Sequence, residues 1–227
     1  FPSNVELNKE GYEDVSTVIN KSLNPINMQD FNLLRKQDDI LILDVRSKSL
    51  FSKGHIPGSL FIGLEGMFAP WAGTVIEDIN QKIIIVSPNG KEEEAISRLA
   101  RVGFDNVVGF LDGGYDRWAK SFGKIKKIKC VSAKEFISEA SSSRKNIYDV
   151  RDEDEFKISH FPGAKNTPLK KIDRYIGELR KKSPFYIYCK AGYRSVIASS
   201  IINKANDLEL INIEGGYDMI EKLNFSA

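Results

Sequence analysis

The chain has 227 residues, 41% of them hydrophobic and 28% charged, with a formal net charge of +2. It is long enough to bury a sizeable core, but no apolar run approaches the roughly 20 residues that a membrane span requires. Its 2 cysteines and 2 histidines are too few for a disulfide framework or a zinc cluster. We therefore expect no metal site and no membrane partner, and the low cysteine content favours a reducing, cytoplasmic location.

The first 25 residues mix charged side chains with Asn, Ser and Gly, and they end at Asn24-Pro25. This composition predicts a linker over residues 1–25. Because the chain opens with Phe1-Pro2 and not with Met, we expect it to be processed or to be a piece of a longer protein that carries an upstream domain.

Short apolar runs and amphipathic stretches then alternate along the chain. A helix is predicted over 26–34 with Asn27 as its N-cap, and a second helix over 94–102. Apolar runs bounded by charge predict buried parallel strands. In this half of the chain they span residues 40–45, 83–86 and 107–110.

The same succession returns about 100 residues later, with Ser132 as a helix cap and a helix over 195–204. Strands are predicted over 146–150, 185–188 and 210–213. Three short motifs also occur twice: Asp-Val-Arg at 44–46 and 149–151, His-x-Pro-Gly at 55–58 and 160–163, and Gly-Gly-Tyr-Asp at 113–116 and 215–218.

A repeat of this length indicates a duplicated domain, and strands that alternate with helices indicate parallel pairing. We predict an α/β fold with domains at 26–124 and 125–227, each a mostly parallel central sheet flanked by helices. Residues 125–227 hold 19 Lys and Arg against 14 Asp and Glu, and residues 1–124 hold 14 against 17. This bias fits a small anionic ligand for the second domain, whereas no basic stretch interleaved with aromatics suggests nucleic acid.

Cys189 follows the buried run 185–188 and precedes a helix that begins near Ser195. Its sulfur is therefore predicted at the carboxyl end of a parallel strand, where open α/β sheets bind ligands. The short loop can aim amide N–H groups at one point, Gly192 permits a tight turn, and Arg194 adds a permanent positive charge. These features favour the thiolate over the neutral thiol, so Cys189 is the candidate catalytic nucleophile.

The ordered motifs Asp-Val-Arg, Gly-His-Ile-Pro-Gly, Cys-x-x-Gly-x-Arg-Ser and Gly-Gly-Tyr resemble those of the rhodanese superfamily, over nearly all of residues 26–227. The resemblance implies tandem rhodanese-like domains and a sulfurtransferase. Cys189 would take sulfane sulfur from thiosulfate or a low-molecular-weight persulfide, hold it as a persulfide, and pass it to a thiol or to cyanide. The implied partners are a small anionic sulfur donor and a thiol acceptor. The substrate-binding residues would be Lys190, Ala191, Gly192, Tyr193, Arg194 and Ser195.

Three further residues of the second domain have a supporting role in this interpretation. In the superfamily, the Asp-x-Arg segment ends a core strand and braces neighbouring loops, which implies this role for Asp149 and Arg151. His160 lies in a turn with Pro162 and Gly163, and His55 holds the same position in the first copy. A thiolate that is already ionised needs no general base, so we interpret His160 as structural.

The first domain carries a degenerate version of the loop. Ser87 aligns with Cys189 and Gly90 with Gly192, while Glu92 and Glu93 fall at the positions of Arg194 and Ser195. A serine forms no persulfide and carboxylates repel an anionic donor, so we predict no sulfur transfer in this domain. The first copy also has a longer apolar stretch at 64–73, expected either to close its own core or to pack on a neighbour.

Two other functions compete with sulfur transfer by an enzyme. Cys-based phosphatases and arsenate reductases use a related loop, but with one more residue than the four between Cys189 and Arg194. The shorter ring is expected to fit sulfur better than a phosphate. Alternatively, the chain is a non-enzymatic persulfide carrier that one partner loads and another unloads.

A narrower resemblance concerns a class of fusion proteins. The segment Val5–Tyr12, the insert at 67–73 and the order of an inactive domain before an active one are similar to the tail of metallo-β-lactamase-like persulfide dioxygenases fused to rhodanese domains. The resemblance implies an upstream domain with an iron cofactor. No His-x-His-x-Asp-His motif occurs in this chain, so we expect no cofactor here.

Overall fold

A computed structural model describes residues 15–142, 146–204 and 208–224. They form two compact units. Of these residues, 15–47 and 55–126 make up the first unit, and 48–54 together with those from 127 onward make up the second. Segment Val5–Tyr12, which carries part of the narrower resemblance, lies outside the described residues.

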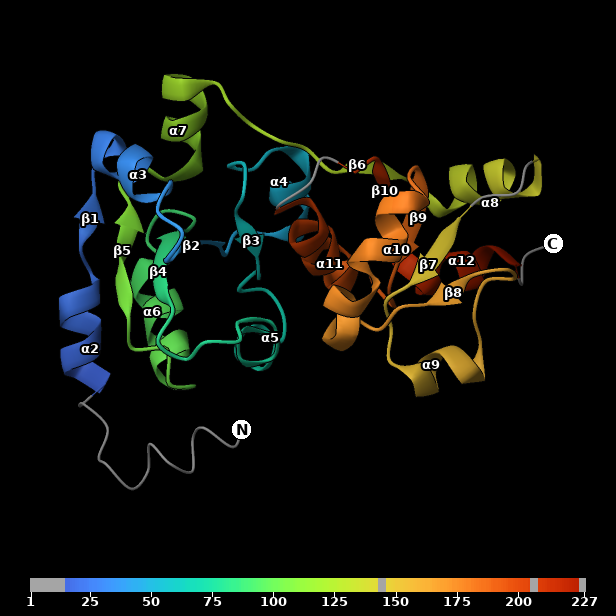
Figure 1. The fold of residues 1–227 in the computed structure, drawn as a ribbon, viewed down its shortest axis with the longest axis horizontal. Coiled ribbons are helices and arrows are strands. Elements are labelled where there is room, and N and C mark those ends of the chain that lie inside the picture. The colour runs from blue at the N-terminus through green and yellow to red at the C-terminus, as the bar shows by residue number, and fades with distance from the viewer. Residues whose placement is uncertain (1–14, 143–145, 205–207, 225–227) are drawn as a thin grey trace. The chain divides into compact units, whose positions relative to one another are not determined.

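Each unit contains a five-stranded, wholly parallel sheet with helices packed on it, and the two sheets have the same topology (Figure 1). In the first unit the strand order is β1-β5-β4-β2-β3, with β1 Pro25–Ile26, β2 Ile40–Asp44, β3 Leu60–Phe61, β4 Lys82–Val86 and β5 Val107–Leu111. In the second it is β6-β10-β9-β7-β8, with β6 Lys129–Val131, β7 Ile147–Asp149, β8 Lys165–Asn166, β9 Phe185–Tyr188 and β10 Leu210–Ile213. The predicted fold class is confirmed.

The helices alternate with the strands, as expected for βα units. The first unit contains α2 Val15–Ser22, α3 Met28–Leu34, α5 Phe68–Val75, α6 Glu92–Ala100 and α7 Gly114–Phe122. The second contains α4 Lys48–Lys53, α8 Ala133–Ser142, α9 Glu153–Ile158, the 3-10 helix η1 Leu169–Tyr175, α10 Ile176–Lys181, α11 Tyr193–Lys204 and α12 Gly216–Asn224.

The structure adds elements that the sequence patterns did not predict. The outermost strands β1, β3, β6 and β8 have two or three residues each, too few for a hydrophobic period to be recognised. Residues 15–22, expected within a linker, form helix α2, where Val18 is 1% exposed. Helix α4 lies in the first sequence repeat but belongs to the second unit, where the Ile128 amide donates to the Ser52 carbonyl.

Helix starts follow from side chains that satisfy the free amides of the first turn. The Asn27 side chain accepts hydrogen bonds from the amides of Gln29 and Asp30, which fixes the start of α3. Ser132 and Glu135 form the reciprocal pair at the start of α8, each side chain accepting from the other residue's backbone amide. The caps predicted at residues 27 and 132 are therefore confirmed.

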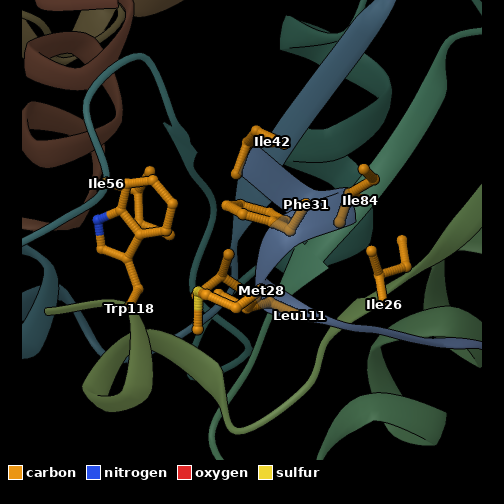
Figure 2. Close-up of a cluster of buried hydrophobic side chains, with 9 residues drawn as sticks. Ile26, Met28, Phe31, Ile42, Ile56, Ile84, Leu111 and Trp118 are labelled. Carbon is orange, nitrogen blue, oxygen red and sulfur yellow. The ribbon is translucent and has the colours of Figure 1, made fainter. Parts of the chain in front are cut away.

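One apolar cluster in the core of the first unit lies between the sheet and the helices α3 and α7 (Figure 2). Phe31 of α3 and Trp118 of α7 are fully buried, and their rings meet edge to face with centroids 5.5 Å apart. The Trp118 indole N–H donates to the Lys124 carbonyl, which satisfies its one polar group. The sheet contributes Ile26, Ile42, Ile84, Val86 and Leu111.

Replacing Phe31 with Ala should leave a cavity in this cluster and destabilise the first unit by about 3–5 kcal/mol. Leu33 of the same helix is 63% exposed, so Leu33→Ala should change stability by less than about 0.5 kcal/mol. Urea unfolding followed by tryptophan fluorescence measures both, because the chain's 2 Trp residues, at 71 and 118, lie in the first unit. Equal effects of the two substitutions would contradict this assignment of the core.

The second unit packs one face of its sheet on α8 and α12. Phe136 and Ile220 of these helices meet Tyr186, Tyr188 and the inward residues of β10. Side chains alternate across a strand, so Ile187 and the residue after β9 at position 189 belong to the opposite face.

Among the described residues of both units, no helix combines the length and apolar character needed to cross a membrane.

Candidate functional site

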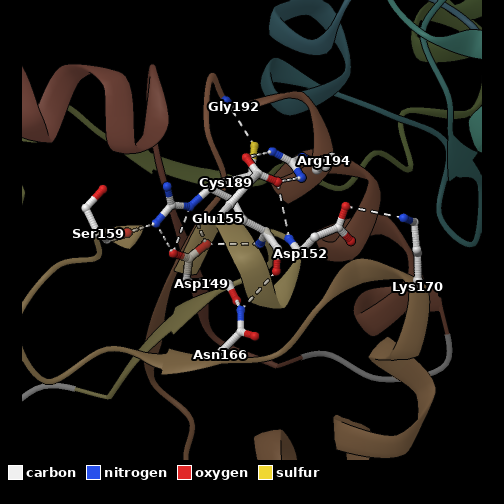
Figure 3. A network of polar contacts seen from close by, with 10 residues as sticks. Asp149, Asp152, Glu155, Ser159, Asn166, Lys170, Cys189, Gly192 and Arg194 are labelled. Carbon is white, nitrogen blue, oxygen red and sulfur yellow. Dashed lines mark hydrogen bonds and ion pairs between the residues drawn. The ribbon is translucent and has the colours of Figure 1, made fainter. Parts of the chain in front are cut away.

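Cys189 is the first residue after β9, and the loop from Cys189 to Gly192 leads directly into α11. The thiol lies inside this loop and is 1% exposed (Figure 3). The Gly192 amide points back at it, with its nitrogen 3.1 Å from the Cys189 Sγ. Gly192 has φ +85°, a backbone conformation that side chains disfavour, and this geometry turns its N–H toward the sulfur.

The start of α12 holds the loop from the other side. The Tyr217 amide donates to the Cys189 carbonyl at 2.7 Å, and the Asp218 amide donates to the Lys190 carbonyl at 3.0 Å. Gly216 has φ +60°, and a Cβ atom at this position would lie 2.2 Å from the Cys189 oxygen. The loop therefore reaches its position only because residue 216 has no side chain.

Gly216→Ala should displace the Cys189 loop, and we expect a loss of stability of roughly 2–5 kcal/mol from the left-handed backbone and the clash together. Gly114 is the matched control, since it holds the same place in the first repeat with φ +58°, but its Cβ would lie 3.2 Å from the Ser87 oxygen. Gly114→Ala should cost only about 1–2 kcal/mol. Urea unfolding followed by circular dichroism compares the two variants, and an equal cost would refute the close approach at Gly216.

Arg194, in the first turn of α11, forms a two-pronged ion pair with Glu155 of α9 (Figure 3). One of its contacts to the Glu155 carboxylate measures 2.8 Å. Burial alone would lower the pKa of Arg194, but Glu155 and the nearby Cys189 sulfur raise it above its ordinary value. The same ion pair lowers the pKa of Glu155. Arg194 therefore stays charged beside the sulfur, held by a carboxylate from another helix.

Asp149 and Arg151 form a buried pair that connects the end of β7 to the start of α12. The Arg151 guanidinium donates to both Asp149 oxygens, at 2.6 Å for the shortest contact, and to the Ser159 carbonyl at 2.7 Å. Its other face lies over the ring of Tyr217, with the guanidinium carbon 4.2 Å from the centroid. Because the Tyr217 amide binds the Cys189 carbonyl, the pair supports the loop indirectly.

The remaining loop residues have distinct environments. Lys190 is exposed, Tyr193 is half-buried, and the exposed Ala191 accepts a hydrogen bond at its carbonyl from the Lys48 ammonium, at 2.6 Å. Ser195 is fully buried at the start of α11. Its Oγ has no hydrogen-bond partner among the residues that the structure describes.

His160 lies apart from the sulfur contacts described above. It is exposed, its Nδ1 is 2.8 Å from the Phe156 carbonyl oxygen, and its ring stacks on Phe156 with centroids 3.9 Å apart. His55, its counterpart in the first repeat, is buried and pairs through its backbone with Lys126. Both contacts fit structural roles.

The first unit contains the corresponding loop without its chemistry. Gly90 has φ +78°, close to that of Gly192, but the Ser87 hydroxyl donates to the Glu92 carboxylate at 3.0 Å. Glu92 and Glu93 begin α6 and place negative charge where the second unit has Arg194 and Ser195. In the insert at 64–73, Phe68 is 1% exposed, and the helix α5 that it begins lies against α6 of the same unit.

Two residues that support the Cys189 loop were not predicted from the sequence. Glu155 belongs to the Asp152–Glu155 capping box of α9, a pattern readable from the sequence, but nothing local indicates its ion pair with Arg194. Gly216 was recognised only as part of a repeated motif, and the repetition of that motif was the signal for its role.

Over the described residues, no three His, Cys, Asp or Glu side chains come together as a metal site.

Comparisons with known proteins agree with the duplicated fold. The family model of the rhodanese-like domain matches residues 27–121 and 132–222. The chain is 32% identical over 90 residues to the uncharacterized protein YqhL of Bacillus subtilis. This match covers 40% of this chain and 70% of that protein. It is 33% identical over 98 residues to the thiosulfate sulfurtransferase GlpE of Pseudoalteromonas translucida. This match covers 42% of this chain and 88% of that protein.

Among solved structures, the chain is similar to a rhodanese-like domain protein from Staphylococcus aureus. The identity is 28% and the TM-score 0.38, and the match covers 41% of this chain and 91% of the other.

Proposed function

The chain belongs to the rhodanese-like domain family, and on this premise we propose that it is a sulfurtransferase with its active site in the second unit. It would move sulfane sulfur from thiosulfate or a low-molecular-weight persulfide to a thiol or cyanide, through a persulfide on Cys189. The observation that carries the proposal is the Cys189 thiol at the end of β9, with the Gly192 amide 3.1 Å from its sulfur. Similarity to a thiosulfate sulfurtransferase adds support.

In the first step, the Cys189 thiolate attacks the outer sulfur of thiosulfate. A bond forms between the Cys189 Sγ and that sulfur, the sulfur–sulfur bond of thiosulfate breaks, and sulfite leaves with the electron pair. The total charge does not change. No proton has to move when the thiol is already ionised, so the step requires no general base.

In the second step, the acceptor thiolate or cyanide attacks the outer sulfur of the persulfide, and Cys189 leaves as a thiolate. Between the steps, the terminal sulfur is an anion that needs donors. Three features support its stabilisation: the Gly192 amide, the positive end of the twelve-residue helix α11, and the Ser195 hydroxyl, which lacks a partner among the described residues.

Cys189→Ser should abolish transfer of sulfur from thiosulfate to cyanide, because a serine hydroxyl forms no persulfide. Ser87→Ala is the matched control at the corresponding position of the first unit, and it should keep full turnover. Both variants are measured by thiocyanate formation, with intact mass after thiosulfate treatment to detect one added sulfur atom. Turnover that survives Cys189→Ser would end the proposal.

The same measurements separate the alternatives. A non-enzymatic persulfide carrier gains one sulfur at Cys189 but does not turn over with thiosulfate and cyanide. A Cys-based phosphatase or arsenate reductase hydrolyses an aryl phosphate or reduces arsenate, and gains no sulfur. The four residues between Cys189 and Arg194 favour sulfur over these reactions.

Arg194 is proposed to attract the anionic donor and to stabilise the charge on sulfur. Arg194→Ala removes this cation and leaves the Glu155 carboxylate uncompensated nearby, so kcat/KM for thiosulfate should fall about 10- to 100-fold, from the loss of a charge-assisted contact. The double variant Arg194→Ala/Glu155→Ala removes the leftover charge as well and should recover part of the loss. An unchanged thiosulfate dependence in the single variant would exclude Arg194 from this role.

We further propose that the first unit has a structural or docking role and that sulfur transfer needs no cofactor bound to this chain.

We also propose that the protein works in a reducing, cytoplasmic compartment. Its two free cysteines support this location. Fusion to an upstream metallo-β-lactamase-like domain with iron is likewise a proposal, supported by the inactive-then-active order of the domains. The gene sequence upstream of Phe1 tests it.

A further inference from the structure

A cavity of about 440 Å³ lies within the second unit, beside the Cys189 loop. It is bordered by α4, by the segment leading into β6, and by the end of β10. Gly192 lines one part of its wall, while Cys189 is not among the lining residues. The cavity is therefore separate from the sulfur site but touches the loop residue whose amide binds the Cys189 sulfur.

One wall carries a buried polar group without a partner. Asn212 of β10 is 3% exposed, and its Oδ1 makes no hydrogen bond within the described part of the chain. Its amide nitrogen lies 3.8 Å from the Cys130 sulfur on the neighbouring strand β6. An unsatisfied buried acceptor is unfavourable, so a donor that met the Asn212 Oδ1 after a small turn of this side chain would remove that penalty.

The charges around the cavity favour an anion. Three lysines line it, Lys48, Lys53 and Lys127, against one carboxylate, Glu214. Lys53 and Lys127 are exposed at the rim, and Lys48 holds the Ala191 carbonyl at 2.6 Å. Clustered charge of one sign in a concave surface raises the local concentration of the opposite ion.

The size of the cavity narrows the ligand class. Its volume falls in the range of about 300–1,000 Å³ that is typical of small-molecule sites and exceeds what a thiosulfate ion fills. Val196 and Ile128 give part of the wall an apolar character. An organic molecule fits this combination better than an inorganic ion.

We propose that this cavity is a second binding site, which takes a small organic anion that carries an N–H or O–H donor. The acidic groups of the ligand interact with Lys53 and Lys127, and the donor binds the Asn212 Oδ1. The ligand contacts the Cys189 loop at Gly192. This inference rests on the cavity alone and does not depend on the proposed sulfur transfer.

Cys130 provides a direct probe of the cavity because it lines the wall beside Asn212. The chain has 2 cysteines, so Cys189→Ser leaves Cys130 as the one thiol to be labelled. Burial raises the pKa of the Cys130 thiol, and labelling with iodoacetamide is therefore followed at alkaline pH, where its thiolate is populated.

Two probes share a four-carbon dicarboxylate backbone: N-acetylaspartate carries an acetamido group with an amide N–H on it, and succinate carries no such group. N-acetylaspartate in the millimolar range should slow labelling of Cys130 about tenfold, and succinate should need a severalfold higher concentration for the same protection. If neither probe changes the labelling rate in this range, the proposal is overturned.

Variants identify the groups responsible. Lys53→Gln/Lys127→Gln should raise the concentration for half-protection about tenfold or more for both probes. Asn212→Ser should abolish the difference between the probes. Lys134→Gln, an exposed lysine on α8 outside the cavity, is the matched control and should change nothing. The lysine substitutions are at exposed positions and should not disturb the fold. Equal protection in the double lysine variant and the control would overturn the proposal.

Discussion

The position of the Cys189 loop depends on a close approach of two backbone segments. The carbonyls of Cys189 and Lys190 accept hydrogen bonds from the first amides of α12, and Gly216 lies where a Cβ atom would come within 2.2 Å of the Cys189 oxygen. With its carbonyls engaged on one side, the loop can direct the Gly192 amide at the sulfur on the other. The free amides at the start of α12 thus hold the loop in position before any substrate binds.

The charged groups around the loop are arranged in pairs, each holding a different element in place. Asp149 and Arg151 connect the end of β7 to the Tyr217 ring at the start of α12, and Glu155 of α9 holds Arg194 of α11. A buried charge without a partner is strongly unfavourable, so each pair also fixes the orientation of its own strand or helix. The Glu155–Arg194 ion pair keeps a cation beside the sulfur.

Comparison of the two units separates fold from chemistry. The first unit keeps the buried Asp44–Arg46 pair, with the Arg46 guanidinium carbon 3.9 Å from the centre of the Tyr115 ring, and it keeps a left-handed glycine in the corresponding loop. It has lost the thiol and the cation, and its Ser87 hydroxyl is bonded to Glu92. The buried Asp–Arg pair that both units share therefore belongs to the architecture of the sheet. The nucleophile and the charge of the loop, by contrast, can change without loss of the fold.

The sequence by itself determined the duplication, the interior strands, the helix caps at Asn27 and Ser132, and the position of Cys189 after a buried strand, because these features are written in local patterns. Tertiary structure alone decided which distant groups meet: Glu155 with Arg194 across 39 residues, and Cys130 with Asn212 across 82. Strand order and register bring such residues to one edge or face of the sheet, and no local period encodes either. The short edge strands and the placement of α4 in the second unit depend on the same long-range packing.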